Sequence, residues 1–153
     1  MAFPLKKIPL QKVDCRKVNE IISNSYNNDQ YGRENHENLR DVIDVNKENK
    51  NTIISIIDKC GWSTIYTSQI NKVFIMIQHM DTEFVARYYP VFLECYKEGK
   101  FSNVNYARII DRLLMNNSFP QIYGTQEVDE SCYGIKDEEN VNDRRKKLGL
   151  SPL

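Results

Sequence analysis

A set of polar side chains is carried by otherwise apolar segments of this chain, and these residues are the ones that could do chemistry together. The set consists of Gln78, His79, Asp111, Arg112, Gln121, Tyr123 and Gln126. Because burying polar groups is costly unless they satisfy one another, we expect this polar set to converge. Imidazole, carboxylate, phenol and amide groups beside an arginine are what an acid–base site with an anion-binding group would use.

Two interpretations of the polar set are open. In an enzyme or ligand-binding protein, His79 would be the proton shuttle, Asp111 its orienting carboxylate and Arg112 the group that binds an anionic substrate, because an imidazole titrates near neutrality and an arginine does not. The other members of the set would contact the ligand. In a non-catalytic structural or interaction module, the same contacts would tie a hairpin to a helical bundle. Both interpretations predict that His79, Asp111 or Arg112, and Tyr123 or Gln126 share hydrogen bonds, directly or through one water.

Metal and cofactor chemistry has little support in the sequence. His79 with Asp81 or Asp111 offers too few strong ligands for a metal, and His36 lies in a polar segment. The chain has no glycine-rich phosphate loop and no serine in a Gly-x-Ser-x-Gly elbow. We therefore expect no metal and no cofactor, and an unidentified small molecule is the candidate ligand.

Composition indicates one globular domain and no nucleic-acid or membrane partner. Lysine plus arginine and aspartate plus glutamate each number 21, so no net charge attracts nucleic acid or an anionic membrane. No apolar run approaches the ~20 residues needed to span a bilayer, and the first residues lack the apolar core of a secretory leader. The oligomeric state is left open.

Cysteine spacing favours a reducing environment. The four cysteines, Cys15, Cys60, Cys95 and Cys132, are widely separated, and none forms a Cys-x-x-Cys pair. They are typical of buried or inert thiols. We therefore expect a soluble, cytoplasmic protein with four free thiols and no disulfide.

Apolar spacing predicts amphipathic helices along most of the chain. The polar, asparagine-rich residues 35–50 indicate a loop that feeds the second helix. His79 follows the apolar run 73–77 and is therefore flanked by apolar groups, where a histidine is more often a hydrogen-bonded core residue than a catalyst. The predicted helices cover about residues 15–29, 45–60, 69–81, 82–98 and 103–116.

The chain end predicts a small β-hairpin and a final helix. Alternation over residues 121–126, followed by a turn and by Cys132–Ile135, favours a hairpin at about 121–135. Acidic residues at the start and basic residues at the end of residues 137–148 match a helix macrodipole. The leucines that follow this helix should dock on the body of the protein.

Several short motifs together resemble a family of bacterial proteins known only as a domain of unknown function, number 6624. The resemblance covers about residues 29–153 and brings no established reaction. The motifs are Asp29-Gln30 with Arg33, Gly61-Trp62, Gln78-His79, Tyr106-Ala107, Asp111-Arg112, Pro120-Gln121-Ile122-Tyr123-Gly124-Thr125-Gln126, Asp143-Arg144-Arg145 and Leu148-Gly149-Leu150-Ser151-Pro152-Leu153.

These patterns predict a mainly α protein. We expect an arm over residues 1–12 and a single helical domain over 13–153, with about five or six helices around the 69–81 helix. The hairpin at 121–135 and the helix at 137–148 belong to this domain.

Overall fold

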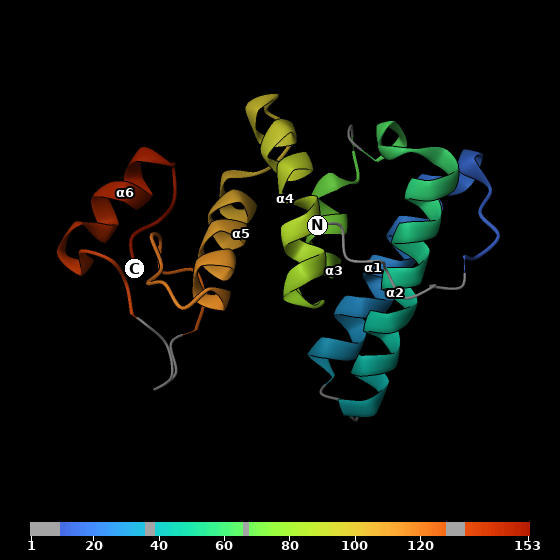
Figure 1. Ribbon diagram of the computed structural model, residues 1–153, viewed down its shortest axis with the longest axis horizontal. Helices are drawn as coiled ribbons and strands as arrows, with labels where there is room; N and C mark the ends of the chain where they lie inside the picture. Colours follow the sequence, from blue (N-terminus) through green and yellow to red (C-terminus); the bar gives the residue numbers. More distant parts are fainter. Residues whose placement is uncertain (1–9, 36–38, 66–67, 128–133) are drawn as a thin grey trace. The chain divides into compact units, whose positions relative to one another are not determined.

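The computed structural model describes residues 10–35, 39–65, 68–127 and 134–153. Within these residues the chain forms α-helices joined by short 3₁₀ turns, so the mainly α fold class is confirmed. The chain divides into two compact units, residues 1–79 and 80–153, and each is described by itself (Figure 1). None of the helices in the described residues has the length and apolarity that crossing a membrane requires.

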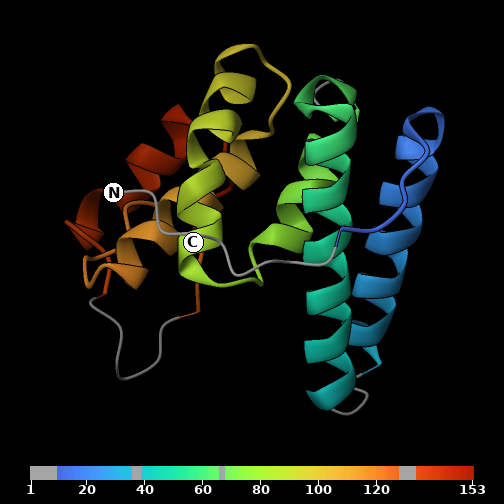
Figure 2. The same ribbon diagram turned by 45° about the vertical axis from the view of Figure 1, so that its right-hand side comes forward.

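The first unit is built on two long helices that lie side by side (Figures 1 and 2). A 3₁₀ turn at Cys15–Lys17 leads into α1 (Val18–Glu34), and α2 (Leu39–Cys60) runs back along it. A second 3₁₀ turn at Trp62–Thr64 precedes α3 (Ile70–Ile77), which contacts both long helices. Apolar side chains from all three helices are almost fully buried, among them Ile22, Ile53, Ile56, Val73 and Phe74.

Helix α2 begins at Leu39, earlier than the predicted start near residue 45, and two of its asparagines bind α1. The carboxylate of Asp29, which is 1% exposed, accepts two hydrogen bonds of 3.0 Å from the Nε and Nη2 atoms of Arg33. Arg33 Nη2 also donates to Asn46 Oδ1 at 2.6 Å, and Asn49 Nδ2 donates to Asp29 Oδ1 at 3.3 Å. Asn46 and Asn49 are therefore on the face of α2 that binds this pair. Gln30 Nε2 also donates to Asp29 Oδ2 at 2.8 Å, so Asp29, Gln30 and Arg33 form one network.

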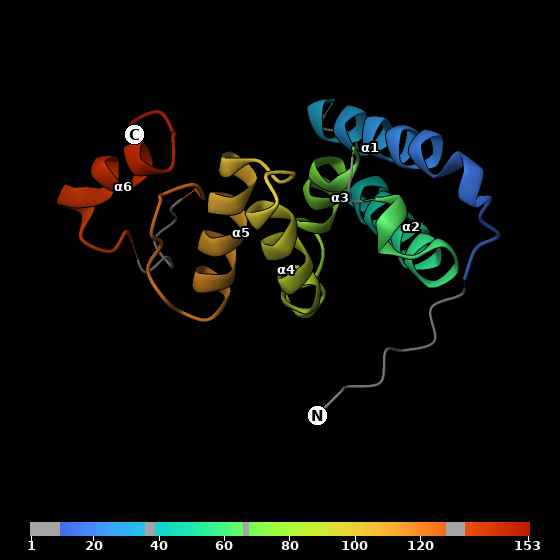
Figure 3. The same cartoon turned by 90° about the horizontal axis from the view of Figure 1, so that it is seen from above.

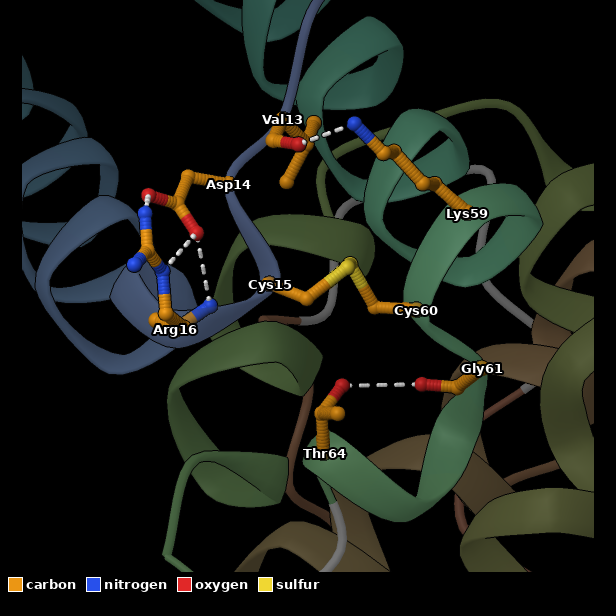
Figure 4. The surroundings of a disulfide bond; sticks show 8 residues. All are labelled: Val13, Asp14, Cys15, Arg16, Lys59, Cys60, Gly61 and Thr64. Atoms are coloured by element: carbon orange, nitrogen blue, oxygen red, sulfur yellow. Dashed lines mark hydrogen bonds and ion pairs between the residues drawn. A yellow bond between two sulfur atoms is a disulfide. The ribbon is translucent and has the colours of Figure 1, made fainter.

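Cys15 and Cys60 form a disulfide, which contradicts the prediction of four free thiols (Figure 4). The antiparallel course of α1 and α2 places the residue that precedes α1 beside the residue that ends α2, although 45 residues separate them in sequence. Lys59 Nζ donates to the Val13 carbonyl at 2.7 Å and ties the same two segments together. Because disulfides persist mainly in oxidising compartments, the argument for a cytoplasmic location no longer holds.

The second unit begins with two capped helices that pack against each other. Asp81 caps α4 (Thr82–Lys97) by accepting from the Phe84 amide at 2.9 Å, and Ser102 caps α5 (Asn103–Asn116) through the Asn105 amide at 3.1 Å. A 3₁₀ turn at Glu138–Asn140 then leads into α6 (Val141–Lys147). The segment that follows α5 passes between α5 and α6 (Figure 3).

The predicted hairpin at 121–135 is not found in the described residues. They contain an isolated parallel bridge between Gln121 and Ile135, where an antiparallel pair was expected. The Gln121 amide donates to Gly134 O at 2.9 Å, and the Lys136 amide donates to Gln121 O at 2.8 Å. Beyond Gln121, the amides that a strand would pair instead bind a side chain of α5, as described below. The predicted turn and Cys132 lie outside the described residues.

The tail that follows α6 is held by polar contacts more than by leucine burial. Arg145 Nε donates to Ser151 O at 2.6 Å, Asn103 Nδ2 donates to Leu148 O at 2.7 Å, and the Leu153 amide donates to Asn142 Oδ1 at 2.9 Å. Leu153 is 62% exposed, so the expectation that it buries is wrong, while Leu148 and Leu150 are half-buried.

Deleting residues 148–153 should still destabilise the protein. Two half-buried leucines and three hydrogen bonds would be lost, and we expect the free energy of unfolding to fall by about 1–3 kcal/mol in urea denaturation. The variant Leu153→Ala is the control, and it should change this quantity by less than about 0.5 kcal/mol because the side chain is exposed. Equal stability of the truncated and complete chains would contradict docking of the tail.

Candidate functional site

Asp111 organises the loop that follows α5. Its carboxylate is fully buried and accepts the amides of Ile122 and Tyr123 at one oxygen, at 2.7 and 3.0 Å. The other oxygen accepts the amide and the hydroxyl of Thr125, at 2.9 and 2.8 Å. Closely spaced amides that converge on one anion form a nest, and here the anion is a side chain of the protein itself. Both oxygens are thus occupied by the loop over residues 121–126.

Gly124 gives this loop the backbone that the nest requires. Its φ is +65°, in the left-handed region that side chains other than glycine rarely adopt. An added Cβ would lie 2.8 Å from Ile135 Cδ1 and 2.9 Å from Leu153 Cδ1. The positive φ is therefore the main reason that this position favours glycine, and a larger residue would also have to displace these two methyl groups.

Gln121 and Gln126 close the loop on itself. Gln121 is fully buried, and its side chain accepts from the Gln126 amide at 2.9 Å and donates to the Gln126 carbonyl at 3.2 Å. The Gln126 side chain in turn donates to Arg108 O at 3.4 Å and Thr125 Oγ1 at 3.2 Å. These contacts fix the position of the Gln126 carboxamide oxygen.

Arg144 and Arg145 of α6 bind the other side of the loop. Arg144 Nε donates to Ile122 O at 2.9 Å, and its terminal nitrogens donate to the carbonyls of Lys136 and Asp137. Arg145 Nη1 donates to Tyr123 O at 2.7 Å. Two charged donors on neighbouring residues therefore clamp two successive loop carbonyls.

Arg112 is the member of the polar set whose charge is not balanced. Its Nη2 donates to Gln126 Oε1 at 2.7 Å, while its buried Nε has no hydrogen-bond partner. Within the described part of the chain, no carboxylate forms an ion pair with it. Burial lowers the pKa of this guanidinium from its usual value, because desolvation penalises the charged form. A buried donor and an unbalanced charge at one residue are what an anion would satisfy.

Tyr123 keeps its proton well into the alkaline range. Burial raises the pKa of its phenol, and the nearby Tyr106 and Asp111 raise it further. Tyr106 itself stacks on Tyr96 with ring centroids 3.9 Å apart, and burial raises its pKa as well. At neutral pH Tyr123 is therefore a hydrogen-bond donor and not a charged base.

Gln78 and His79 lie at the end of the first unit, in the turn directly after α3. The helix ends at Ile77, earlier than the predicted 69–81 range. Gln78 is buried, and its Nε2 lies 3.5 Å from His79 Nε2. The convergence of His79 with the residues of the second unit stays a prediction, as does the single-domain organisation.

The structure thus brings together the five members of the polar set that lie in the second unit, and it adds three residues to them. Thr125, Arg144 and Arg145 were quoted in the sequence motifs, but the arginines were explained by the macrodipole of α6. The role of the arginines could have been inferred from the loop over residues 121–126. Its carbonyls are not paired with a strand and therefore need other hydrogen-bond donors.

An apolar groove of ≈ 340 Å³ lies beside the loop in the second unit, lined by Tyr89, Ile110, Leu113, Leu114, Asn117, Phe119 and Ile122. Neither His79 nor Arg112 lines it. Among the described residues, no group of three or more histidine, cysteine, aspartate or glutamate side chains could hold a metal ion.

Comparison with known proteins identifies a family but no characterised relative. The sequence profile described as "Family of unknown function (DUF6624)" matches residues 13–153. Comparisons with curated proteins and with solved structures give no match.

Proposed function

We propose that this chain, which belongs to the family of unknown function DUF6624, binds a small anionic molecule through Arg112. The observation that carries the proposal is the buried Nε of Arg112, which has no hydrogen-bond partner among the described residues. Leaving a buried donor unpaired costs about 1–3 kcal/mol, more when the donor is charged, so a native protein needs a reason to retain it. A bound anion would supply both the acceptor and the missing negative charge.

The contacts around Arg112 support a pre-organised site. Gln126 Oε1 holds Nη2, and Gln126 is itself held by Gln121 and by the carbonyl of Arg108. Asp111 is adjacent in sequence, but both its oxygens bind the 121–126 loop. Asp111 is therefore better described as a positioning residue, and it leaves the charge of Arg112 available to a ligand.

A more specific version of this proposal is that the protein also catalyses a reaction of the bound anion. His79 would act as the proton shuttle and Tyr123 would donate a hydrogen bond to the bound anion, since its pKa is raised by burial. Gln78, which lies beside His79, would help to orient the imidazole. This form requires His79 and Arg112 to meet at one ligand.

The alternative is a non-catalytic module in which the network only holds the fold. The hydrogen bonding of Asp111 favours this alternative. Its carboxylate accepts four hydrogen bonds from one loop, as a structural carboxylate does. In that case Arg112 Nε would remain without a partner in the working protein.

Titration with anions separates the two functions. Sodium phosphate and sodium citrate would be added at constant ionic strength while the Nε–H resonance of Arg112 is followed by ¹⁵N NMR. We expect a saturable shift of this resonance in the wild type, since the anion would accept from Nε. Anion binding should also raise the melting temperature of the wild type. The variant Arg112→Gln should not show this rise. The variant Arg87→Gln, which changes an exposed arginine of α4, should show it.

Two results would contradict anion binding. One is an Nε–H resonance that does not respond to either anion, and the other is an equal rise in melting temperature for Arg112→Gln and the wild type. The variant His79→Gln tests the catalytic version of the proposal. Retained folding with weakened citrate or phosphate binding would place His79 in the site, whereas lost stability alone would assign it to the scaffold.

A further inference from the structure

A second pocket lies in the first unit, lined by residues from the last two turns of α1 and from the first turns of α2. Its volume is ≈ 260 Å³. Ligand pockets for drug-sized molecules measure about 300–1,000 Å³, so this one suits a smaller molecule. It is lined by Asn28, Asp29, Tyr31, Gly32, Arg33, Asp41, Val42 and Val45.

Gly32 is the first observation that points to an occupant. It lies in the last turn of α1, where a glycine favours the helix less than alanine does. Packing does not require it, because an added Cβ would have nothing within 4 Å. Its φ is also not in the positive range that would favour glycine. A glycine that neither backbone nor packing requires, at the wall of a pocket, keeps space open for another molecule.

Arg33 is the second observation. Asp29 and Asn46 fix this guanidinium through Nε and Nη2. The Nη1 atom makes no hydrogen bond to any other described residue, although the side chain is 25% exposed. The pocket therefore presents an immobilised donor whose charge is already balanced by the buried carboxylate of Asp29.

The other walls determine which ligand fits best. Val42, Val45 and the ring of Tyr31 supply apolar contact, and Tyr31 is 61% exposed. Asp41 adds an exposed carboxylate with no ion pair among the described residues. An anionic ligand would be repelled by Asp41. A cationic ammonium ligand has no acceptor for the Arg33 Nη1 donor and would leave it unpaired. A neutral molecule with a hydrogen-bond acceptor avoids both penalties.

We propose that this pocket between α1 and α2 binds an uncharged small molecule with an apolar body and a carbonyl-type oxygen, which accepts a hydrogen bond from Arg33. The apolar body would lie against Val42, Val45 and Tyr31, and Gly32 would provide the space for it. This site is distinct from the one around Arg112 and does not depend on it.

Three probes of the same shape but different charge test the site: benzamide, benzoate and benzylamine. We expect benzamide to shift the backbone amide resonances of residues 28–33 and 41–45 in ¹⁵N NMR, with a dissociation constant of about 1 mM, as the size of the probe allows. Benzoate should bind roughly tenfold more weakly because it meets the carboxylate of Asp41. Benzylamine should bind roughly tenfold more weakly because it offers no acceptor to Arg33 Nη1.

A substitution at Gly32 links the binding to this pocket and controls for folding. The variant Gly32→Leu should raise the melting temperature, because leucine favours a helix more than glycine does. It should also abolish the benzamide shifts, because its side chain enters the open space. Asn24→Leu, at an exposed position of α1 outside the pocket, is the matched control and should leave the shifts unchanged.

Three results would overturn the proposal. The pocket is not a binding site if benzamide shifts none of these resonances. Its ligand class is wrong if benzoate or benzylamine binds more tightly than benzamide. Its location is wrong if Gly32→Leu folds and still binds benzamide as the wild type does.

Discussion

Replacing Asp111 with asparagine will lower the free energy of unfolding by about 3 kcal/mol, because the donors at one of its two oxygens would face the NH2 group of asparagine, which cannot accept a hydrogen bond. The amide of Thr125, bound to Oδ2 at 2.9 Å, could not turn away from the substituted group. Urea denaturation measures the loss. Hydrogen exchange should show faster exchange at Ile122, Tyr123 and Thr125 than in the wild type.

The control is Asp143→Asn, an exposed carboxylate in the first turn of α6. It should cost less than about 1 kcal/mol, the typical value of an exposed charge at a helix N-terminus. If Asp111→Asn were as stable as Asp143→Asn, the carboxylate would not hold the 121–126 loop. The orienting role for His79 would then become the better explanation of Asp111.

The sequence indicated which polar residues could contact one another, but not the roles they have. Polar residues on apolar elements must satisfy one another, and Arg112 does share a hydrogen bond with Gln126, while the grouping with His79 stays a prediction. The rule does not say which atoms pair. The carboxylate of Asp111 accepts from backbone amides of the loop, and the positive φ of Gly124 is part of the backbone conformation that brings those amides together.

The errors in the fold have one physical origin, contacts between residues distant in sequence. Local patterning predicted the positions of α3, α4 and α5 to within a few residues. Residues 39–44 were expected to lie in a loop, although they form the first part of α2, whose Asn46 and Asn49 bind the Asp29–Arg33 pair of α1. Alternation at 121–126 favoured a strand, although a side chain of α5 binds its amides. In each case a tertiary partner outweighed local preference.

The disulfide is the largest error of this kind, and it leads to a second prediction. Reducing the bond between Cys15 and Cys60 will lower the free energy of unfolding by about 4 kcal/mol, because the bond closes a long loop in the unfolded chain. The sequence separation of 45 residues sets the size of this entropic term. The loop contains α1 and α2, so equilibrium denaturation followed by helical circular dichroism will report the loss.

The double variant Cys15→Ser/Cys60→Ser gives the matched control, because it cannot form the bond and should be indifferent to reductant. It should denature as the reduced wild type does. Peptide mapping without reduction should join the peptides that contain Cys15 and Cys60. The buried Cys95, whose thiol pKa is raised by burial, should resist alkylation until the protein unfolds. Free Cys15 and Cys60 thiols in protein purified without reductant would contradict the bond and would restore the case for a reducing compartment.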